Sequence, residues 1–270
     1  MTMPEAPPKN RFNPGLPINF DRSSMDFRYG DGLFGPRPEY RALNAIRRSL
    51  RDPNCSGPDP VYSIVMDVGR ERDLEELQRR MLLFGIVMYA AGRLGDEPVR
   101  SQGHVHAISP HSGWSAPELF EIWEGRAIIY GQEKSGDDPG RCIAIEAGPG
   151  DKVVMPPGWA HFVANADPHS ALIFAAWCDR QYGFDYAQTR AHHGLAWFPL
   201  LDAGSNIHWE PNPNYSPSKL QTRKPRDYPE LGLTYSIPIY EYLDRGPEAI
   251  QWVSDPARLG HLWPHFEPSV

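Results

Sequence analysis

Between residues 82 and 178 the sequence alternates short apolar segments with turns that contain glycine or proline. The first segment, residues 82–89, is followed by others that end at turn residues such as Gly125 and the Pro149-Gly150 pair. Short apolar segments with this punctuation are typical of β-strands, and several in succession are typical of a small β-barrel. The sequence therefore predicts an all-β centre.

Two histidines separated by a single residue, His104 and His106, lie inside this region. Successive side chains of an extended strand point to opposite faces, so both imidazoles are expected on one side, where they can reach the same ion. Glu118 is expected to join them from a neighbouring strand, because the β-favouring residues 119–123 follow it and lead to the turn residue Gly125.

Residues 150–165 supply a further imidazole. They begin at a turn, continue as an apolar strand through residues 153–155 and reach His161 through a Pro-Pro-Gly turn. Three imidazoles and one carboxylate leave two positions open on an octahedral ion, and this donor set suits divalent Fe, Mn, Ni or Co and admits Zn. The predicted metal ligands are His104, His106, Glu118 and His161.

The two stretches resemble the two cupin motifs. The second motif, which is Gly, five residues, Pro, x-Gly, two residues, His, three residues and Asn, is matched at every position from Gly150 to Asn165. The first motif is His-x-His followed by Glu, six residues and Gly. This sequence differs from it in two ways: Pro98 stands where the motif has glycine, and eleven residues separate His106 from Glu118 where the motif has only a few. The resemblance implies a cupin barrel, that is, a double-stranded β-helix or jelly roll that holds a divalent metal.

A second candidate for the carboxylate ligand is Glu121. Glu118 is favoured because it stands seven residues before Gly125, as the motif requires, whereas Glu121 stands four residues before it. The insertion at residues 107–117 is expected at the mouth of the site, where His111 is a candidate substrate contact.

Four segments taken together are similar to the cupin-type glucose-6-phosphate isomerases, and the likeness runs from residue 36 to about residue 215. They are residues 37–43 (RPEYRAL), 59–62 (DPVY), 95–106 (GDEPVRSQGHVH) and 156–161 (PPGWAH). The resemblance implies an aldose–ketose isomerase that works through an enediolate, with the same four metal ligands and with Glu118 also moving the proton. It further implies that the Ser101 hydroxyl helps to hold the substrate and that Tyr186 lines the pocket as a second catalytic residue.

Three positions differ from the resembling isomerases, because Val87, Gly158 and Trp177 stand where that family has hydroxyl-bearing residues of the pocket. These differences predict a more apolar pocket and a hydroxy-carbonyl substrate other than glucose 6-phosphate. Two alternative functions are a metal-dependent cupin oxygenase and a sugar-binding cupin without catalysis. Turnover without O2 separates the isomerase from the oxygenase, and Glu118 separates an enzyme from a binding module, which has no need of a proton-moving carboxylate.

The length of 270 residues suits one domain with extensions or two small domains. Residues 38–50 and 71–81 carry apolar residues at helical spacing, and residues 61–68 are typical of a strand. The predicted fold is an all-β cupin barrel with N-terminal helical and C-terminal extensions. The expected division is an N-terminal arm (1–35), a cupin isomerase-like domain (36–215) and a C-terminal extension (216–270).

The net charge of −7 provides no basic surface for nucleic acid or for an anionic membrane. No apolar run approaches the ~20 residues that cross a bilayer, and residues 1–9 lack the apolar core of a signal peptide, so a cytoplasmic protein is expected. The three cysteines, Cys55, Cys142 and Cys178, have no Cys-x-x-Cys spacing and are expected to be reduced and buried. The expected partners are a small-molecule substrate and a second copy of the chain, in a homodimer joined through barrel edges.

Overall fold

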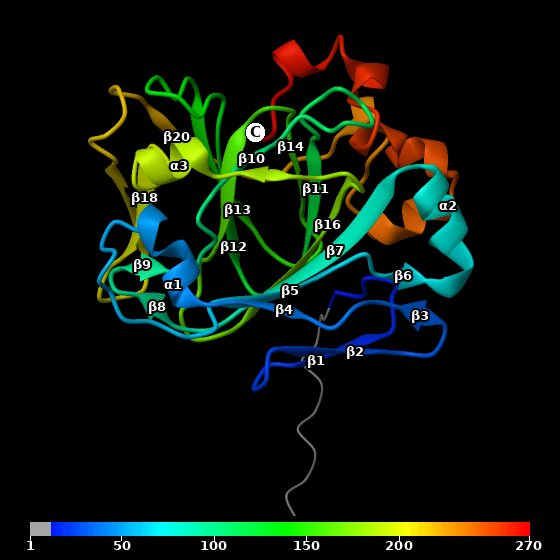
Figure 1. Ribbon diagram of the computed structural model, residues 1–270, viewed down its shortest axis with the longest axis horizontal. Helices are drawn as coiled ribbons and strands as arrows, with labels where there is room; N and C mark the ends of the chain where they lie inside the picture. Colours follow the sequence, from blue (N-terminus) through cyan, green and yellow to red (C-terminus); the bar gives the residue numbers. More distant parts are fainter. Residues whose placement is uncertain (1–11) are drawn as a thin grey trace, which may run out of the picture.

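Two β-sheets form the walls of a barrel in the computed structural model, which describes residues 12–270 (Figure 1). The part of the predicted N-terminal arm at residues 1–11 lies outside the described residues. The six-stranded sheet has the order β14-β11-β16-β7-β5-β4, and the four-stranded sheet has the order β15-β12-β13-β20. The prediction of an all-β jelly-roll barrel is confirmed.

The strands of these sheets are mostly short and buried, as the apolar segments predicted. The six-stranded sheet consists of β4 (Glu39–Arg41), β5 (Tyr62–Met66), β7 (Leu82–Tyr89), β11 (Glu118–Glu124), β14 (Lys152–Met155) and β16 (Leu172–Asp179). The four-stranded sheet consists of β12 (Ala127–Gln132), β13 (Cys142–Ala147), β15 (Ala160–Asn165) and β20 (Leu220–Arg223). All eight residues of β7 and all eight of β16 are buried, because both faces of this sheet are covered.

The inner face of the six-stranded sheet borders a cavity, and its outer face is covered by segments from the N-terminal and C-terminal parts of residues 12–270. On β16 the alternation is direct: Ala176 and Cys178 line the cavity, whereas Trp177 points away from it. The indole Nε1 of Trp177 donates to the carbonyl oxygen of Ile239 at 3.0 Å, and its ring stacks on Tyr240 with centroids 5.4 Å apart. Strand alternation thus assigns one set of β16 residues to the site and the other to the C-terminal segment.

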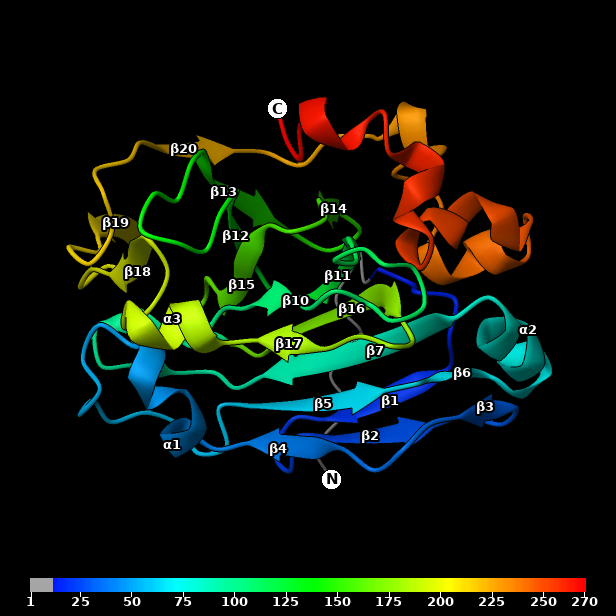
Figure 2. The same cartoon turned by 45° about the horizontal axis from the view of Figure 1, so that its top comes forward.

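The C-terminal segment after β20 consists of short 3-10 helices that pack beside the barrel (Figure 2). Its two tryptophans and its one phenylalanine, Trp252, Trp263 and Phe266, are buried in the main core. The helices are η3 (Pro229–Leu231), η4 (Ile239–Leu243), η5 (Pro247–Val253), η6 (Pro256–Leu259) and η7 (Trp263–His265).

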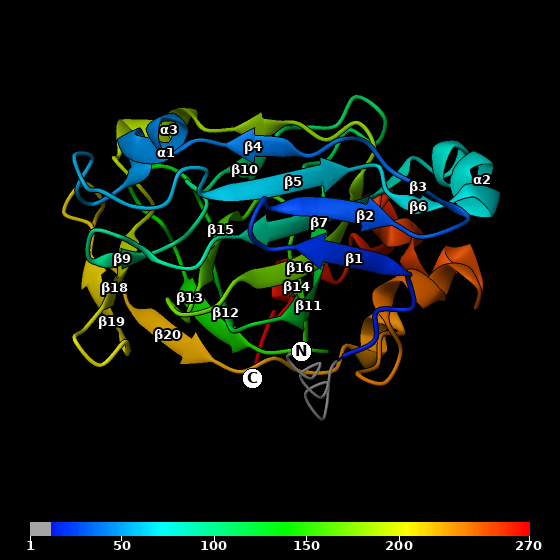
Figure 3. The ribbon, with the colours of Figure 1, turned by 90° about the horizontal axis from the view of Figure 1, so that it is seen from below.

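The described part of the predicted N-terminal arm folds against the six-stranded sheet, as Figure 3 shows from below. Strands β1 (Ile18–Asp21) and β2 (Asp26–Tyr29) form an antiparallel hairpin, and β3 (Leu33–Phe34) pairs with β6 (Gly69–Arg70). The ring of Phe20 lies 6.1 Å from the ring of Trp123 on β11. The hairpin therefore covers apolar surface of the barrel.

The helix expected at residues 38–50 is shorter in the structure, where α1 (Leu43–Ile46) and η1 (Arg47–Ser49) replace it. The prediction is wrong for residues 39–41, because their backbone pairs with β5 as strand β4. Tyr40 is consequently 51% exposed, whereas Leu43 and Ile46 are buried as expected.

The other two local predictions are confirmed: β5 occupies the strand expected at residues 61–68, and residues 71–81 begin with η2 (Glu71–Asp73) and α2 (Leu74–Arg79). None of the helices in residues 12–270 is long and apolar enough to cross a membrane. The remaining elements are β8 (Arg93–Leu94), β9 (Glu97–Pro98), β10 (Val105–His106), β17 (Phe184–Asp185), α3 (Ala187–Ala191), β18 (Trp197–Leu201) and β19 (Ile207–Pro211).

Candidate metal centre

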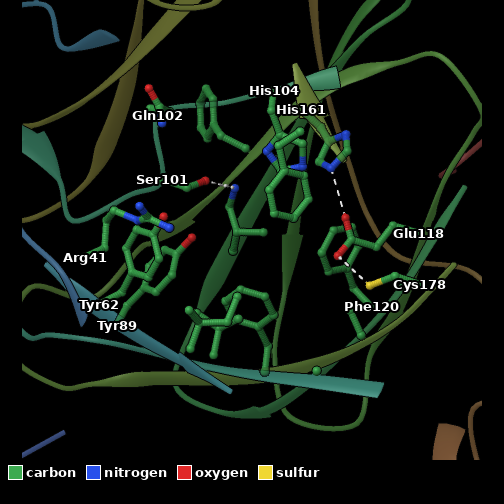
Figure 4. Close-up of a pocket in the computed structure, with 18 of the residues that line it drawn as sticks. Arg41, Tyr62, Tyr89, Ser101, Gln102, His104, Glu118, Phe120, His161 and Cys178 are labelled. Carbon is green, nitrogen blue, oxygen red and sulfur yellow. Dashed lines mark hydrogen bonds and ion pairs between the residues drawn. The ribbon is translucent and has the colours of Figure 1, made fainter. Parts of the chain in front are cut away.

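A cavity of about 700 Å³, which includes space open to solvent, lies inside the barrel (Figure 4). Strands β5, β7, β11, β15 and β16 contribute to its wall, together with the segments around Ser101 and Tyr186. Many of the side chains that line it are apolar, including Val87, Phe120 and Phe174. The polar groups are gathered in two places, one of which is the predicted metal site.

The structure brings the four predicted ligands together: one side-chain donor atom from each residue lies within 4.8 Å of those of the others (His104, His106, Glu118 and His161). Backbone pairing produces this arrangement, because the amide of His104 donates to the carbonyl of His161 at 3.0 Å and the reverse bond is 2.9 Å. Gly103 precedes the pair with a φ of 84°, a left-handed conformation that glycine adopts without strain. The two motif stretches are thus joined by an isolated antiparallel bridge between His104 and His161.

The histidine tautomers leave donor atoms free for an ion. The Nδ1 atom of His106 lies 2.9 Å from the carbonyl oxygen of Ala116, and the Nδ1 atom of His161 lies 3.0 Å from the carbonyl oxygen of Trp159. A carbonyl oxygen only accepts, so each Nδ1 carries a hydrogen, and each Nε2 has a lone pair to offer when its ring is neutral. The Nε2 atoms of His104 and His106 are buried and have no hydrogen-bond partner.

The carboxylate of Glu118 faces these lone pairs. Its Oε2 atom lies 3.0 Å from Nε2 of His161 and 3.3 Å from Nε2 of His106. Lone pairs on neutral imidazoles and on a carboxylate repel one another at such distances unless a proton or a cation lies between them. The donor set therefore fits a divalent metal ion.

The pKa values of Glu118, His104 and His106 are shifted because these side chains are buried close together. Burial alone would raise the pKa of Glu118, but its contacts with His106 and His161 outweigh burial and hold that pKa well below its usual range. Burial and the neighbouring imidazoles lower the pKa of His104 well below its usual value. Burial opposes the charged form of His106, but the carboxylate of Glu118 outweighs it and raises the pKa of His106. An ionised carboxylate beside a neutral imidazole is a metal-binding form.

Glu121, the alternative carboxylate, lies away from the cluster. Its Oε1 atom is 3.3 Å from Nζ of Lys152 and accepts a hydrogen bond of 3.0 Å from the amide of Ile239. Its Oε2 atom accepts a hydrogen bond of 3.1 Å from the indole of Trp123. Burial raises the pKa of Glu121 to about 7, although Lys152 acts in the opposite direction. Glu118 is the glutamate that the fold places beside the three histidines.

Ser101 and Tyr186 both line the cavity. The Ser101 hydroxyl accepts a hydrogen bond of 3.4 Å from the amide of Val163, and the Tyr186 ring lies 5.9 Å from the ring of His104. Burial is the main cause that raises the pKa of Tyr186 to about 12, so its hydroxyl stays protonated at neutral pH. Tyr186 is therefore placed to donate a hydrogen bond rather than to act as a base.

The insertion at residues 107–117 differs from its expected place at the mouth of the site. His111 is exposed and is not among the residues that line the cavity, so its predicted contact with substrate stays a prediction. The ring of Trp114 is partly buried against the core and lies beside Gly260 of the C-terminal segment. The insertion thus joins the barrel to that segment.

Of the three positions that differ from the resembling isomerases, only Val87 lines the cavity. Trp177 faces the C-terminal segment, and Gly158 lies outside the cavity wall. The expectation that all three make the pocket more apolar is corrected to Val87 alone.

Sequence reasoning missed several cavity residues. Arg41, Tyr62 and Tyr89 form a polar group opposite the metal ligands, and Cys178 places its Sγ 3.9 Å from Oε1 of Glu118 (Figure 4). Burial raises the pKa of Cys178 well above its usual value, so it stays a thiol. Arg41 and Tyr62 belong to segments that resemble the isomerases, so that resemblance was a signal for these two residues. Only the order of the strands in the sheet shows that they meet in the cavity.

A barrel of two sheets with three histidines and one glutamate gathered inside it defines a cupin. The sequence pattern of one family, described as glucose-6-phosphate isomerase (GPI), matches residues 39–216. The chain therefore belongs to the glucose-6-phosphate isomerase family.

No curated protein sequence matches the chain. Among solved structures, vicilin from Corylus avellana (hazelnut) is similar with a TM-score of 0.35 and 12% identity, over 48% of this chain and 33% of that chain. A deletion mutant of Bacillus subtilis oxalate decarboxylase OxdC has a TM-score of 0.31 and 14% identity, over 47% of this chain and 28% of that chain. An oxalate oxidase has a TM-score of 0.34 and 17% identity, over 47% and 55%. The chain thus spans less than two thirds of each of these proteins.

Proposed function

We propose that this protein is a metal-dependent isomerase that interconverts an aldose and a ketose, or a related pair of hydroxy-carbonyl compounds, through an enediolate. The observation that carries the proposal is the position of the Glu118 carboxylate, which lies with three imidazoles in one cluster and borders a cavity with a largely apolar wall. Membership of the glucose-6-phosphate isomerase family supports it.

In this proposal the metal is a divalent ion, Fe, Mn, Ni, Co or Zn, held by His104, His106, Glu118 and His161. When bound, such an ion supplies positive charge that polarises the substrate oxygens and acidifies the carbon-bound proton between them. The carbonyls of Ala116 and Trp159 keep the Nε2 atoms of His106 and His161 directed into the cluster.

The proton is assigned to Glu118. Its Oε2 atom faces the imidazoles, whereas its Oε1 atom has the weakly polar thiol of Cys178 as its neighbour at 3.9 Å. Oε1 is therefore the atom proposed to take a proton from one carbon and return it to the next. The low pKa keeps this carboxylate ionised, which is the form that can accept a proton, and the apolar wall limits loss of the proton to water.

Ser101 and Tyr186 are proposed to orient the substrate through their hydroxyl groups, since both line the cavity. The protonated Tyr186 donates to a substrate oxygen. A small-molecule substrate and a homodimer are part of the same proposal, and size-exclusion chromatography with light scattering tests the dimer.

The apolar side chains that line the cavity favour a second candidate, a metal-dependent oxygenase, which needs a dry pocket. Val87, Phe120 and Phe174 supply that character. The polar group that includes Arg41 and Tyr62 favours a polar substrate and hence the isomerase.

Conversion of a panel of hydroxy-carbonyl compounds, followed by NMR under anaerobic conditions, tests the proposal. The isomerase is expected to reach equilibrium without O2, and Glu118→Gln is expected to lower kcat by about 10²-fold or more. Glu146→Gln, the same substitution on the solvent side of β13, is the control and should leave kcat unchanged. Strict dependence on O2 would establish the oxygenase instead, and turnover that is unaffected by Glu118→Gln would contradict the assigned proton carrier.

A further inference from the structure

The three histidines of the metal centre differ in what holds their rings. A hydrogen bond from Nδ1 to a carbonyl oxygen fixes the ring of His106, and another fixes the ring of His161. The ring of His104 makes no hydrogen bond to any residue between 12 and 270, and its Nε2 atom is buried without a partner. Because a metal-ligating histidine is normally oriented by such a bond, His104 needs another support.

Aromatic side chains surround the ring of His104, and the closest is the phenyl ring of Phe184. The centres of these two rings are 4.3 Å apart, and the rings are tilted by 54° to each other. The phenyl ring also lies 5.7 Å from the ring of His106 and forms part of the cavity wall. The ring of His161, 4.6 Å from His104, belongs to another ligand, and the ring of Tyr186 is farther away at 5.9 Å. Phe184 is therefore the closest aromatic side chain outside the ligand set.

Backbone pairing holds Phe184 in this place. Strand β17, which begins at Phe184, pairs with β10, and Phe184 lies directly opposite His106 (Figure 2). Next to this pair, the amide of Ala107 donates a hydrogen bond of 2.8 Å to the carbonyl of Gly183. The side chain of Phe184 is only partly buried and lies outside the hydrophobic core. Its position thus depends on the strand that carries a ligand, and the barrel does not need its ring for packing.

We infer that Phe184 is a positioning residue of the metal centre, whose ring keeps the imidazole of His104 in the orientation that brings its donor atom within 4.8 Å of those of the other ligands. The inference rests on the proposed function, because it concerns the metal of that proposal. Without the phenyl ring, the imidazole of His104 is free to turn about its side-chain torsions. The ion then has to order the imidazole when it binds, and this cost weakens its affinity.

Binding of Co²⁺ to the full-length protein, freed of metal beforehand, tests the inference separately from catalysis. Visible absorption in competition with a chelator of known affinity gives the dissociation constant and the ligand-field bands of the bound ion. Phe184→Ala is expected to weaken Co²⁺ binding by about 10- to 100-fold, the effect of removing a group that orients a ligating histidine, and to shift these bands. Phe184→Leu also removes the ring and should change both in the same direction. Phe184→Tyr keeps the ring and should retain the wild-type affinity and spectrum.

Phe34→Ala is the matched control, because it removes a partly buried phenylalanine on β3 that does not line the cavity, and it should leave Co²⁺ binding unchanged. Circular dichroism of the metal-free proteins checks that each variant is folded. Wild-type affinity in the folded Phe184→Ala or Phe184→Leu variant overturns the inference, as does a loss in Phe184→Tyr as large as that in Phe184→Ala. A wild-type protein that binds no Co²⁺ contradicts the metal centre and this inference together. Co²⁺ binding without turnover contradicts the proposed reaction alone.

Discussion

Lys152→Met is predicted to destabilise the protein strongly, because it breaks an ion pair inside the barrel wall. The side chains of Lys152 and Glu121 are 3% and 0% exposed, and Nζ lies 3.3 Å from Oε1. Lys152 also donates a hydrogen bond of 2.9 Å to the carbonyl of Tyr235. Removing one partner of a buried pair leaves an uncompensated charge, which costs about 3–5 kcal/mol.

Thermal unfolding at pH 8 measures this cost. An unfolding entropy of about 2.1 cal/mol/K per residue gives about 0.6 kcal/mol/K for 270 residues, so the midpoint should fall by roughly 5–9 °C. Lys224→Met breaks an exposed pair with Glu146 and is the matched control, with an expected cost below about 1 kcal/mol. The double variant Glu121→Gln/Lys152→Met removes the charge but keeps the acceptor for Ile239, so it should be more stable than Lys152→Met alone.

The pH dependence of the same variant gives a second check. Burial raises the pKa of Glu121 from 4.5 to about 7. Between pH 4.5 and about pH 7, the folded protein therefore keeps a proton on Glu121 that the unfolded chain has released. The stability contributed by this group therefore falls as the pH rises through that window. Lys152→Met should consequently lose less stability at pH 5.5 than at pH 8. Equal stability of Lys152→Met and Lys224→Met at pH 8 would show that the buried pair of Lys152 and Glu121 does not stabilise the fold.

Two further predictions concern the metal centre and the cavity. The purified protein is expected to hold one divalent ion per chain. His161→Ala should lower this occupancy strongly, because it removes a ligand and leaves Glu118 without its closest imidazole. Elemental analysis that finds full occupancy in this variant would contradict the site. Tyr186→Phe should lower kcat/KM by about 10-fold, which is the effect of losing one hydrogen bond. Because the pKa of Tyr186 is about 12, the pH profile of kcat/KM between pH 6 and pH 9 should keep its shape. A changed alkaline limb of that profile would argue against a protonated Tyr186.

The sequence predicted those features of the fold and the site that depend on short spacing. The apolar segments punctuated by turns predicted the strands of the barrel, and the spacing of His104, His106, Glu118 and His161 selected the residues that meet in it. Strand alternation and motif spacing are local properties, so they are readable along the chain.

The features that the sequence did not reveal depend on contacts between distant segments. Arg41 is a cavity residue only because β4 pairs with β5 and β5 with β7, and this pairing also overrides the helical spacing around Tyr40. Trp177 was expected in the pocket, but a shift of one position along a strand moves a side chain to the opposite face. The packing of apolar residues of the N-terminal hairpin could not be predicted, because the partner of Phe20, Trp123, lies about a hundred residues away in the sequence.

Proton exchange with solvent tests the central claim, that Glu118 moves a proton between adjacent carbons of a hydroxy-carbonyl compound. The wild-type protein is incubated in D2O without O2 with the best substrate of the panel, and ¹H NMR follows the carbon-bound hydrogens. The wild-type protein is expected to give isomerised product and deuterium at the carbon next to the carbonyl, and Glu118→Gln is expected to give neither. Product that forms only with O2, or exchange that persists undiminished in Glu118→Gln, would contradict it.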